Sequence, residues 1–462
     1  METALKQERR HEIDMCSGSV LKKMLAFSLP LMCSGILQLL FNAADIVVVG
    51  RFAGDNSLAA VGSTSSLINL LTNLFVGLSI GTNVAAARAF GAKHEKDVST
   101  IVHTSIPLGA VCGIFMTATG LIGAEKVLGI MQTPADVLPL AVIYLRIYFI
   151  GMPAVMIYNF GSAILRSIGD TKRPLYYLLI SGAVNVVLNL IFVICFDMGV
   201  AGVALATVIS QVLSAFLVVR CLTKESGAVH LDLKKMKIDT KKLLLILQIG
   251  LPAGFQGAVF SLSNVVIQSA VNSFGEVTVA GNSAAGNIEG FIYIAMNSFY
   301  QSTLSFMSQN MGAGKYDRIN KIVITGLSCV AAVGLILGNA AALFGEQLLG
   351  IYSDSPDVIA AGMIRIEIIC CTYALCGIMD VMVGALRGLG YSVLPMIVSL
   401  IGACGLRLVW IATVFQMPEY HAISTVYYSY PITWTITFAA HIICYLILSR
   451  KYTKKENLRN EQ

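Results

Sequence analysis

Long apolar windows recur along this chain of 462 residues, and short polar breaks separate them. A bilayer core about 30 Å thick needs roughly 20 apolar residues in each helix that crosses it. Soluble domains are usually about a quarter charged, whereas only 13% of this chain is charged and 56% is hydrophobic. The windows therefore predict an all-α integral membrane protein.

Twelve such windows are present, and each is expected to form one transmembrane helix. The first apolar run is too long for a signal peptide, so the polar segment before it is predicted to be a retained leader. Prolines inside or at the ends of the windows, Pro30, Pro153, Pro252 and Pro431, are expected to bend helices. The expected spans are 24–50, 57–86, 98–123, 137–165, 172–196, 200–223, 242–272, 278–310, 318–344, 357–386, 391–416 and 422–449.

The basic residues are distributed unevenly between the two sides of the predicted membrane. Of the 32 Lys and Arg residues, 27 fall in segments on the side of the N-terminus, whereas the opposite loops hold only Arg51 and Lys126. Because cytoplasmic loops retain Lys and Arg, this bias predicts a multi-pass protein of the plasma (inner) membrane with both termini in the cytoplasm. Topology accounts for the net charge of +6, so no nucleic-acid partner is expected.

Eleven cysteines and six histidines do not indicate a disulfide framework or a metal site. The cysteines are scattered through apolar windows, as Cys112 and Cys370 illustrate, and the histidines form no pairs at ligand spacing. The chain also lacks a pair of catalytic groups, such as His with Asp, at one membrane surface. We expect no metal site, no bound cofactor and no enzymatic activity.

The sequence repeats itself at a spacing of about 222 residues. KKMLAFSLP at 22–30 matches KKLLLILQIGLP at 241–252, and ILRSIGDTKRP at 164–174 matches ALRGLGYSVLP at 385–395. Two parallel six-helix repeats with a cavity at their interface are typical of alternating-access transporters, although channels also contain repeats. The predicted parts are a cytoplasmic leader at 1–23, an N-terminal six-helix lobe at 24–223, a cytoplasmic linker at 224–241, a C-terminal six-helix lobe at 242–450 and a cytoplasmic tail at 451–462.

Polar residues inside the spans are the candidates for function, because a carboxylate within a bilayer costs a few kcal/mol. Asp45 shares one helical face with Gln38 and Asn42, at spacings of seven and three residues. Further polar stripes are expected on the fifth helix, with Asn185 and Asn189, and on the sixth, with Thr207 and Gln211. Amide and hydroxyl side chains can also serve only to join helices by hydrogen bonds. A carboxylate is not needed for that purpose. Asp45 is therefore the first candidate for a cation or proton site.

Other buried charges lie in the second half of the chain. Glu289 is predicted to line the cavity of that half, together with Asn264 and Gln268. Asp380 and Arg407 lie on successive helices and can form a structural ion pair. Arg365 and Glu367 are close enough in sequence for a local ion pair.

Several segments, in order along the chain, resemble the multidrug and toxic compound extrusion (MATE) transporters, in particular their DinF-like branch. The resemblance implies an antiporter that exports organic, often cationic, compounds while H⁺ or Na⁺ enters. It also implies an ion-coupling group of Asp45, Asn185, Asn189 and Thr207, although Asn189 stands where the branch has a second acid. The segments are SLPLM (28–32), ADIVVVGRFAGDNSLAAVG (44–62), ILRSIGDTKRP (164–174), NVVLN (185–189), GVAGVALATVISQ (199–211) and SQNMGAGKYDRI (308–319).

The expected function is secondary active efflux of small organic compounds by alternating access of the two lobes of a monomer in the lipid bilayer. Gln38, Asn42, Gln211, Asn264, Gln268 and Glu289 are expected to line the substrate cavity. The alternative is a flippase for lipid-linked oligosaccharides or lipids with the same overall fold. A passive scramblase or channel is a further possibility that ion-independent flux would reveal.

Overall fold

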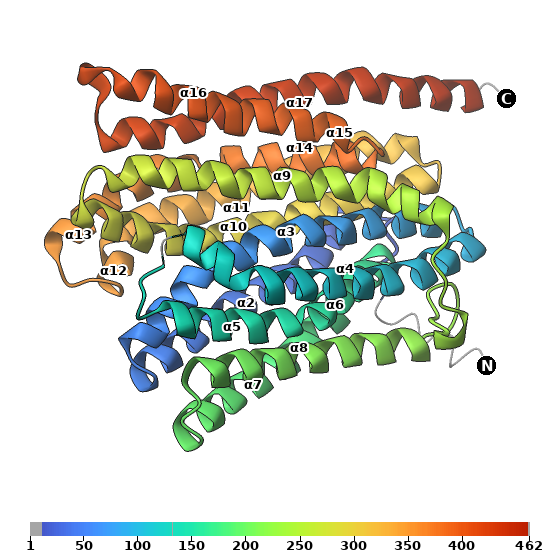
Figure 1. The fold of residues 1–462 in the computed structure, drawn as a ribbon. Helices are drawn as coiled ribbons and strands as arrows, with labels where there is room; N and C mark the ends of the chain where they lie inside the picture. The colour runs from blue at the N-terminus through green and yellow to red at the C-terminus, as the bar shows by residue number, and fades with distance from the viewer. Residues whose placement is uncertain (1–11, 132, 461–462) are drawn as a thin grey trace. The chain divides into compact units, whose positions relative to one another are not determined.

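The computed structural model describes residues 12–131 and 133–460, and every regular element in them is a helix (Figure 1). The first half contains α2 (Val20–Phe52), α3 (Asp55–Gly91), α4 (Glu95–Ile130), α5 (Leu138–Ile150), α6 (Met152–Ser167), α7 (Lys172–Leu190) and α8 (Gly199–Lys224). The second half contains α9 (Thr240–Asn272), α10 (Glu276–Gly312), α11 (Ile319–Leu343), α12 (Gly345–Gly350), α13 (Pro356–Arg365), α14 (Ala374–Gly388), α15 (Val393–Ser399), α16 (Leu406–Ala412) and α17 (Ile423–Asn460).

Nine helices in the described ranges are long and apolar enough to cross a membrane, or eleven spans if each of two bent helix pairs is one crossing. These eleven coincide with eleven of the twelve expected spans. The twelfth expected span, 278–310, lies within α10. This helix has 37 residues but is not among those apolar enough to be counted as a crossing. The expected all-α membrane fold is therefore confirmed.

The two bent crossings occupy equivalent places in the repeat. One joins α5 to α6 with a bend of 45°, and the other joins the α13 segment, extended by a π-helical turn at Ile366–Cys370, to α14 with a bend of 44°. Pro153, in the first turn of α6, has no N–H to continue the preceding helix, so a new helix begins there. By contrast, α2, α9 and α17 continue through Pro30, Pro252 and Pro431.

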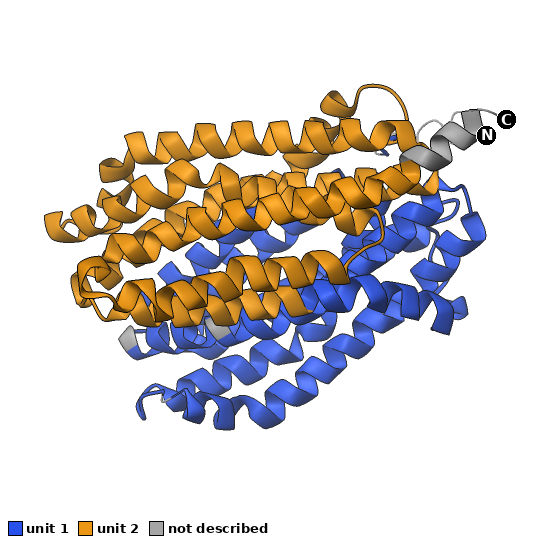
Figure 2. Ribbon diagram, turned by 90° about the horizontal axis from the view of Figure 1, so that it is seen from above, with its two compact units in different colours: residues 1–14, 33–254 blue, residues 15–32, 255–462 orange. Residues whose placement is uncertain are grey.

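The chain divides into two compact units (Figure 2). Unit 1 comprises residues 1–14 and 33–254, and unit 2 comprises residues 15–32 and 255–462. The bounds of these units differ from those of the expected lobes, 24–223 and 242–450. The reason is that the chain crosses from one unit to the other in the middle of α2 and again in the middle of α9. The end of the expected leader belongs to unit 2, where the Nδ2 of Asn310 donates to the Met15 carbonyl at 3.0 Å.

Unit 1 is held together by close helix packing and an apolar core. The helix α4 packs along α6, and a β-carbon at Gly113 would overlap the backbone of Pro153. Fully buried side chains such as Phe149 and Phe160 fill the space between the helices. The hydrophobic effect cannot drive helices together within lipid, because their apolar surfaces are not in contact with water. Close van der Waals packing therefore has to hold the bundle together.

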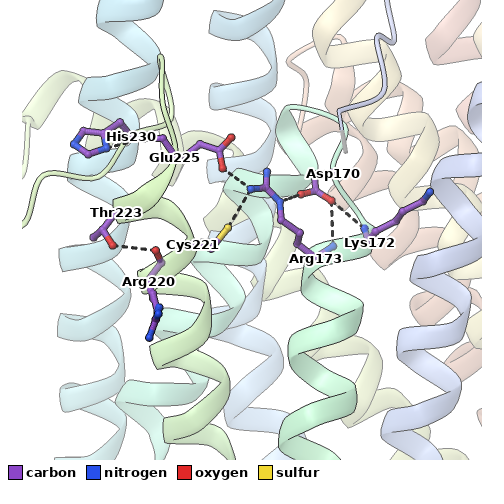
Figure 3. A network of polar contacts seen from close by, with 8 residues as sticks. All are labelled: Asp170, Lys172, Arg173, Arg220, Cys221, Thr223, Glu225 and His230. Carbon is purple, nitrogen blue, oxygen red and sulfur yellow. Dashed lines mark hydrogen bonds and ion pairs between the residues drawn. The ribbon is translucent and has the colours of Figure 1, made fainter. Parts of the chain in front are cut away.

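A polar network joins the turn between α6 and α7 to the end of α8 (Figure 3). Asp170 is fully buried and accepts the N–H groups of Lys172 and Arg173 at 3.1 Å each. The Arg173 guanidinium bridges the carboxylates of Asp170 and Glu225 and lies 3.3 Å from the sulfur of Cys221. One arginine thus ties together two helix ends on the side predicted to be cytoplasmic.

The predicted linker, 224–241, is packed on the start of α4. Val229 and Leu231 are buried in the core of unit 1. The N–H of Asp232 donates to the Nε2 of His103 at 3.0 Å, while the Nδ1 of the same ring lies 2.7 Å from the Ser99 carbonyl. The linker is therefore an integral part of unit 1 and not a free tether.

Candidate functional site

Asp45 meets the amide of Asn189 inside unit 1. The Asn189 Nδ2 donates to the Asp45 carboxylate and lies 3.3 Å from the Oδ1 of Asn185. Asn185 and Asn189 are four residues apart on α7, so both amides project from one face of that helix. The i, i+4 spacing that is visible in the sequence thus explains why the amides are neighbours, and the packing of α7 against α2 brings Asn189 to the acid.

Thr207 of α8 completes this group. Its Oγ1 accepts from the Nδ2 of Asn185 at 3.4 Å, lies 3.0 Å from the Val203 carbonyl and interacts with the Asp45 side chain. Three helices, α2, α7 and α8, thus contribute the four side chains that the family resemblance grouped together. We call these residues, Asp45, Asn185, Asn189 and Thr207, the acid–amide cluster.

The acid–amide cluster contains a carboxylate with only neutral partners. Within the described part of the chain, no Lys, Arg or His forms an ion pair with Asp45. The Oδ1 of Asn189 is buried and has no hydrogen-bond partner among the residues that the structure describes. An acid beside an unused oxygen acceptor can take up a proton or bind a small cation through oxygen ligands.

The other candidates of unit 1 lie outside this hydrogen-bond network. Gln38 and Asn42 are exposed along α2, and Gln211 is half-buried on α8. The structure therefore brings the predicted ion-coupling residues together without joining these three amides to them. Their predicted place in a substrate cavity stays a prediction. No group of three or more potential metal-binding side chains occurs among the described residues.

Unit 2 contains a cavity of about 340 Å³ whose lining includes three predicted residues, Asn264, Gln268 and Glu289. This volume is within the size range of small-molecule pockets, roughly 300–1,000 Å³. Aromatic side chains supply much of the remaining wall. The other lining residues are Ile267, Val271, Asn282, Ser283, Gly286, Arg365, Tyr373, Tyr430 and Trp434.

Glu289 in this cavity is paired with Arg365 from α13. The guanidinium donates from Nε to Oε1 at 2.7 Å and from Nη2 to Oε2 at 2.8 Å. Its Nη1 donates to the Oδ1 of Asn282, 2.5 Å away, which also accepts from the hydroxyl of Tyr427. The expected local pair of Arg365 with Glu367 is wrong, because Arg365 turns toward α10 while Glu367 is exposed.

The expected ion pair between Asp380 and Arg407 is also wrong, since no ion pair joins them in the structure. Arg407 instead lies over the Tyr430 ring, with 3.9 Å between its Cζ atom and the ring centroid. Its Nη2 donates to the Thr433 hydroxyl at 3.2 Å. The aromatic and hydroxyl groups of α17 thus take the place that we assigned to a carboxylate.

Sequence reasoning missed Arg365, Asn282, Tyr430 and Trp434 as parts of this cavity. A usable signal was present for Arg365, since a basic residue inside a predicted span needs a partner and Glu289 was an available acid. The aromatic residues gave no such signal, because Tyr and Trp are common in membrane helices irrespective of function.

Comparison with known proteins identifies relatives along the whole chain. The MatE family model matches twice, at residues 30–191 and 252–413, with the offset of the internal repeat. The probable multidrug resistance proteins YoeA and YpnP of Bacillus subtilis are 26% and 29% identical, covering 91% and 85% of this chain and 92% and 88% of their own. A structure described as the outward-facing conformation of a multidrug resistance MATE family transporter is 21% identical, with a TM-score of 0.89 over 96% of this chain and 99% of its own. At that identity, the structural likeness shows a common fold.

Proposed function

Because the chain belongs to the MatE family of membrane transporters, we propose that it exports organic compounds by secondary active antiport, with H⁺ or Na⁺ coupled through Asp45. The names of its relatives support multidrug export as the general activity. The observation that carries the coupling proposal is the acid–amide cluster, a carboxylate from one helix held by neutral groups from two others.

The chemistry of the cluster explains how one residue can couple two fluxes. Ionised Asp45 attracts a cation, and the oxygens of Asn185, Asn189 and Thr207 offer further ligands. Protonated Asp45 carries no charge and can donate a hydrogen bond to an amide oxygen, since an Asn side chain can present either its oxygen or its nitrogen. The two states therefore differ in their contacts with α7 and α8, and such a difference can bias a conformational equilibrium.

The proposal includes location and topology. The protein lies in the plasma membrane as a monomer, with both termini in the cytoplasm and the two lobes alternating access to a substrate. The distribution of the 32 basic residues supports this orientation. Fusion of a reporter that fluoresces only in the cytoplasm to the C-terminus tests it, and a dark fusion at normal expression would contradict it.

The central experiment uses purified protein in liposomes under an imposed pH gradient or an imposed sodium gradient. Transport of three xanthene dyes is followed: rhodamine 123 (cation), rhodamine 110 (zwitterion) and fluorescein (anion). Flux of at least one dye driven by either gradient, and lost in Asp45→Asn, is the expected result. Val47→Ala, at an exposed position of the same helix to which no role is assigned, serves as the matched control for an intact fold.

Two results would contradict the proposal. Gradient-driven export by Asp45→Asn at the normal rate would remove Asp45 from coupling. Absence of gradient-driven flux for all three dyes, together with accumulation of a lipid-linked glycan in a deletion strain, would favour the flippase alternative.

A further inference from the structure

The cavity of unit 2 contains an acid that is already neutralised by the protein. Both oxygens of Glu289 accept from Arg365, and the two side chains are largely buried. Arg365 thus occupies the position that a cationic ligand would need in order to pair with Glu289. The ion pair contributes no net charge to the cavity wall.

Arg407 adds a positive charge behind the same wall. Only 3% of its surface is exposed, and within the described residues it has no carboxylate partner. Its Nε is buried and finds no hydrogen-bond partner in the ranges 12–131 and 133–460. The guanidinium covers one face of Tyr430 and lies 5.9 Å from the Trp434 ring, and both rings line the cavity. In a medium of low dielectric, a charge at this distance is weakly screened.

The other buried charges of unit 2 do not cancel that of Arg407. Arg387 is buried and donates to Tyr300 and Gln256, at 2.6 and 2.8 Å. Asp380, on the same helix as Arg387, forms no ion pair with Arg407 among the described residues. With Glu289 bound to Arg365, no carboxylate of the described residues forms an ion pair with the cation above Tyr430.

The aromatic side chains give the cavity a preference for flat molecules. The Trp434 ring lies 5.5 Å from both Tyr373 and Tyr430, at interplanar angles of 44° and 72°. Such tilted surfaces accept a planar ring by edge and face contacts. Asn264 and Gln268 on α9 supply polar groups to the same cavity.

We propose that this cavity binds planar aromatic compounds that carry an anionic group, and that Arg407 determines this preference through the Tyr430 and Trp434 wall. The inference rests on the proposed transport function for its physiological meaning, but the binding preference can be measured without transport. It differs from the cationic substrates that the sequence resemblance implies.

The test is equilibrium binding to the full-length protein in nanodiscs, measured by dye anisotropy at mildly alkaline pH. Fluorescein, rhodamine 110 and rhodamine 123 share one xanthene body and differ in charge. The expected order of affinity is fluorescein, then rhodamine 110, then rhodamine 123, with roughly a tenfold difference between the first and the last, equivalent to about 1.4 kcal/mol. Quenching of Trp434 in the Trp410→Phe background places the dye in this cavity, because the chain has only two tryptophans.

Arg407→Gln is expected to abolish the difference between fluorescein and rhodamine 123, while Arg407→Lys retains most of it. Rhodamine 123 binding to the wild type as tightly as fluorescein would overturn the inference, and this comparison does not depend on the folding of a variant. An unchanged preference in well-folded Arg407→Gln would overturn the role of Arg407. If the dyes bind in the expected order but no gradient drives their flux, the proposed antiport is contradicted and the binding inference stands. If a gradient drives flux but the dyes bind in the opposite order, the binding inference is contradicted and the proposed antiport stands.

Discussion

Arg365 of α13 binds Glu289 of α10 through two parallel hydrogen bonds, at 2.7 and 2.8 Å. Asp45 of unit 1 has no such cation within the described part of the chain and is held by an amide and a hydroxyl. Glu289 and Asp45 are therefore chemically different, although both were candidates for function in the sequence. A pre-paired acid stabilises its surroundings, whereas an acid with neutral partners is available to an incoming ion.

Replacing only one member of the Glu289–Arg365 pair should destabilise the protein strongly. Glu289→Gln leaves the guanidinium without a carboxylate, and loss of one partner of a buried ion pair typically costs about 3–5 kcal/mol. The double variant Glu289→Gln, Arg365→Gln should recover part of that loss. Thermal unfolding of both variants and the wild type in one detergent measures the effect. Equal stability of Glu289→Gln and wild type would show that the pair is unimportant.

Asn189→Asp should change the ion preference of the acid–amide cluster. A second carboxylate beside Asp45 favours binding of Na⁺, since hard cations prefer carboxylate oxygens. We expect the sodium concentration for half-maximal export to fall by roughly tenfold, a change of about 1.4 kcal/mol. Asn189→Leu is the control that removes the amide without adding charge. The same sodium dependence in Asn189→Asp and wild type would argue against direct contact between the ion and this cluster.

Asp170→Ala should loosen the start of α7. The buried carboxylate accepts two backbone N–H groups and pairs with Arg173, so its removal leaves three donors unsatisfied. Because Arg173 keeps its contact with Glu225, the expected loss is about 1–3 kcal/mol. Asp170→Asn keeps one acceptor oxygen and should lose less. A melting temperature in Asp170→Ala that matches the wild type would contradict this role.

His103→Phe should release the linker from α4. The substitution preserves an aromatic ring but removes the nitrogen that accepts the N–H of Asp232. Faster proteolysis between residues 225 and 239 is expected, because cleavage requires local opening of the backbone. His103→Gln, which keeps an acceptor, is the matched control. If both variants are cleaved as slowly as the wild type, burial of Val229 and Leu231 holds the linker without help from His103.

Regular spacing made the acid–amide cluster predictable in part. Asn185 and Asn189 are four residues apart, and a helix places such residues on one face irrespective of its neighbours. Helical spacing could not show that these amides lie near Asp45. That prediction came from the resemblance to a transporter family. The cavity of unit 2 was only half predicted. Asn264, Gln268 and Glu289 line it, but the partners assigned to Arg365 and Arg407 were wrong.

The sequence alone determined the membrane fold, because a long apolar segment can satisfy all its backbone hydrogen bonds in hydrocarbon by forming a helix, and the chain contains such segments at regular intervals. The sequence also determined the division into two halves, since similar segments recur at a spacing of about 222 residues. Tertiary structure decided which charges meet. Glu289 and Arg365 are 76 residues apart, and helical periodicity describes only the face of a single helix. The packing of α10 against α13, and of α16 beside α17, determined that one arginine neutralises an acid while the other lies on an aromatic ring.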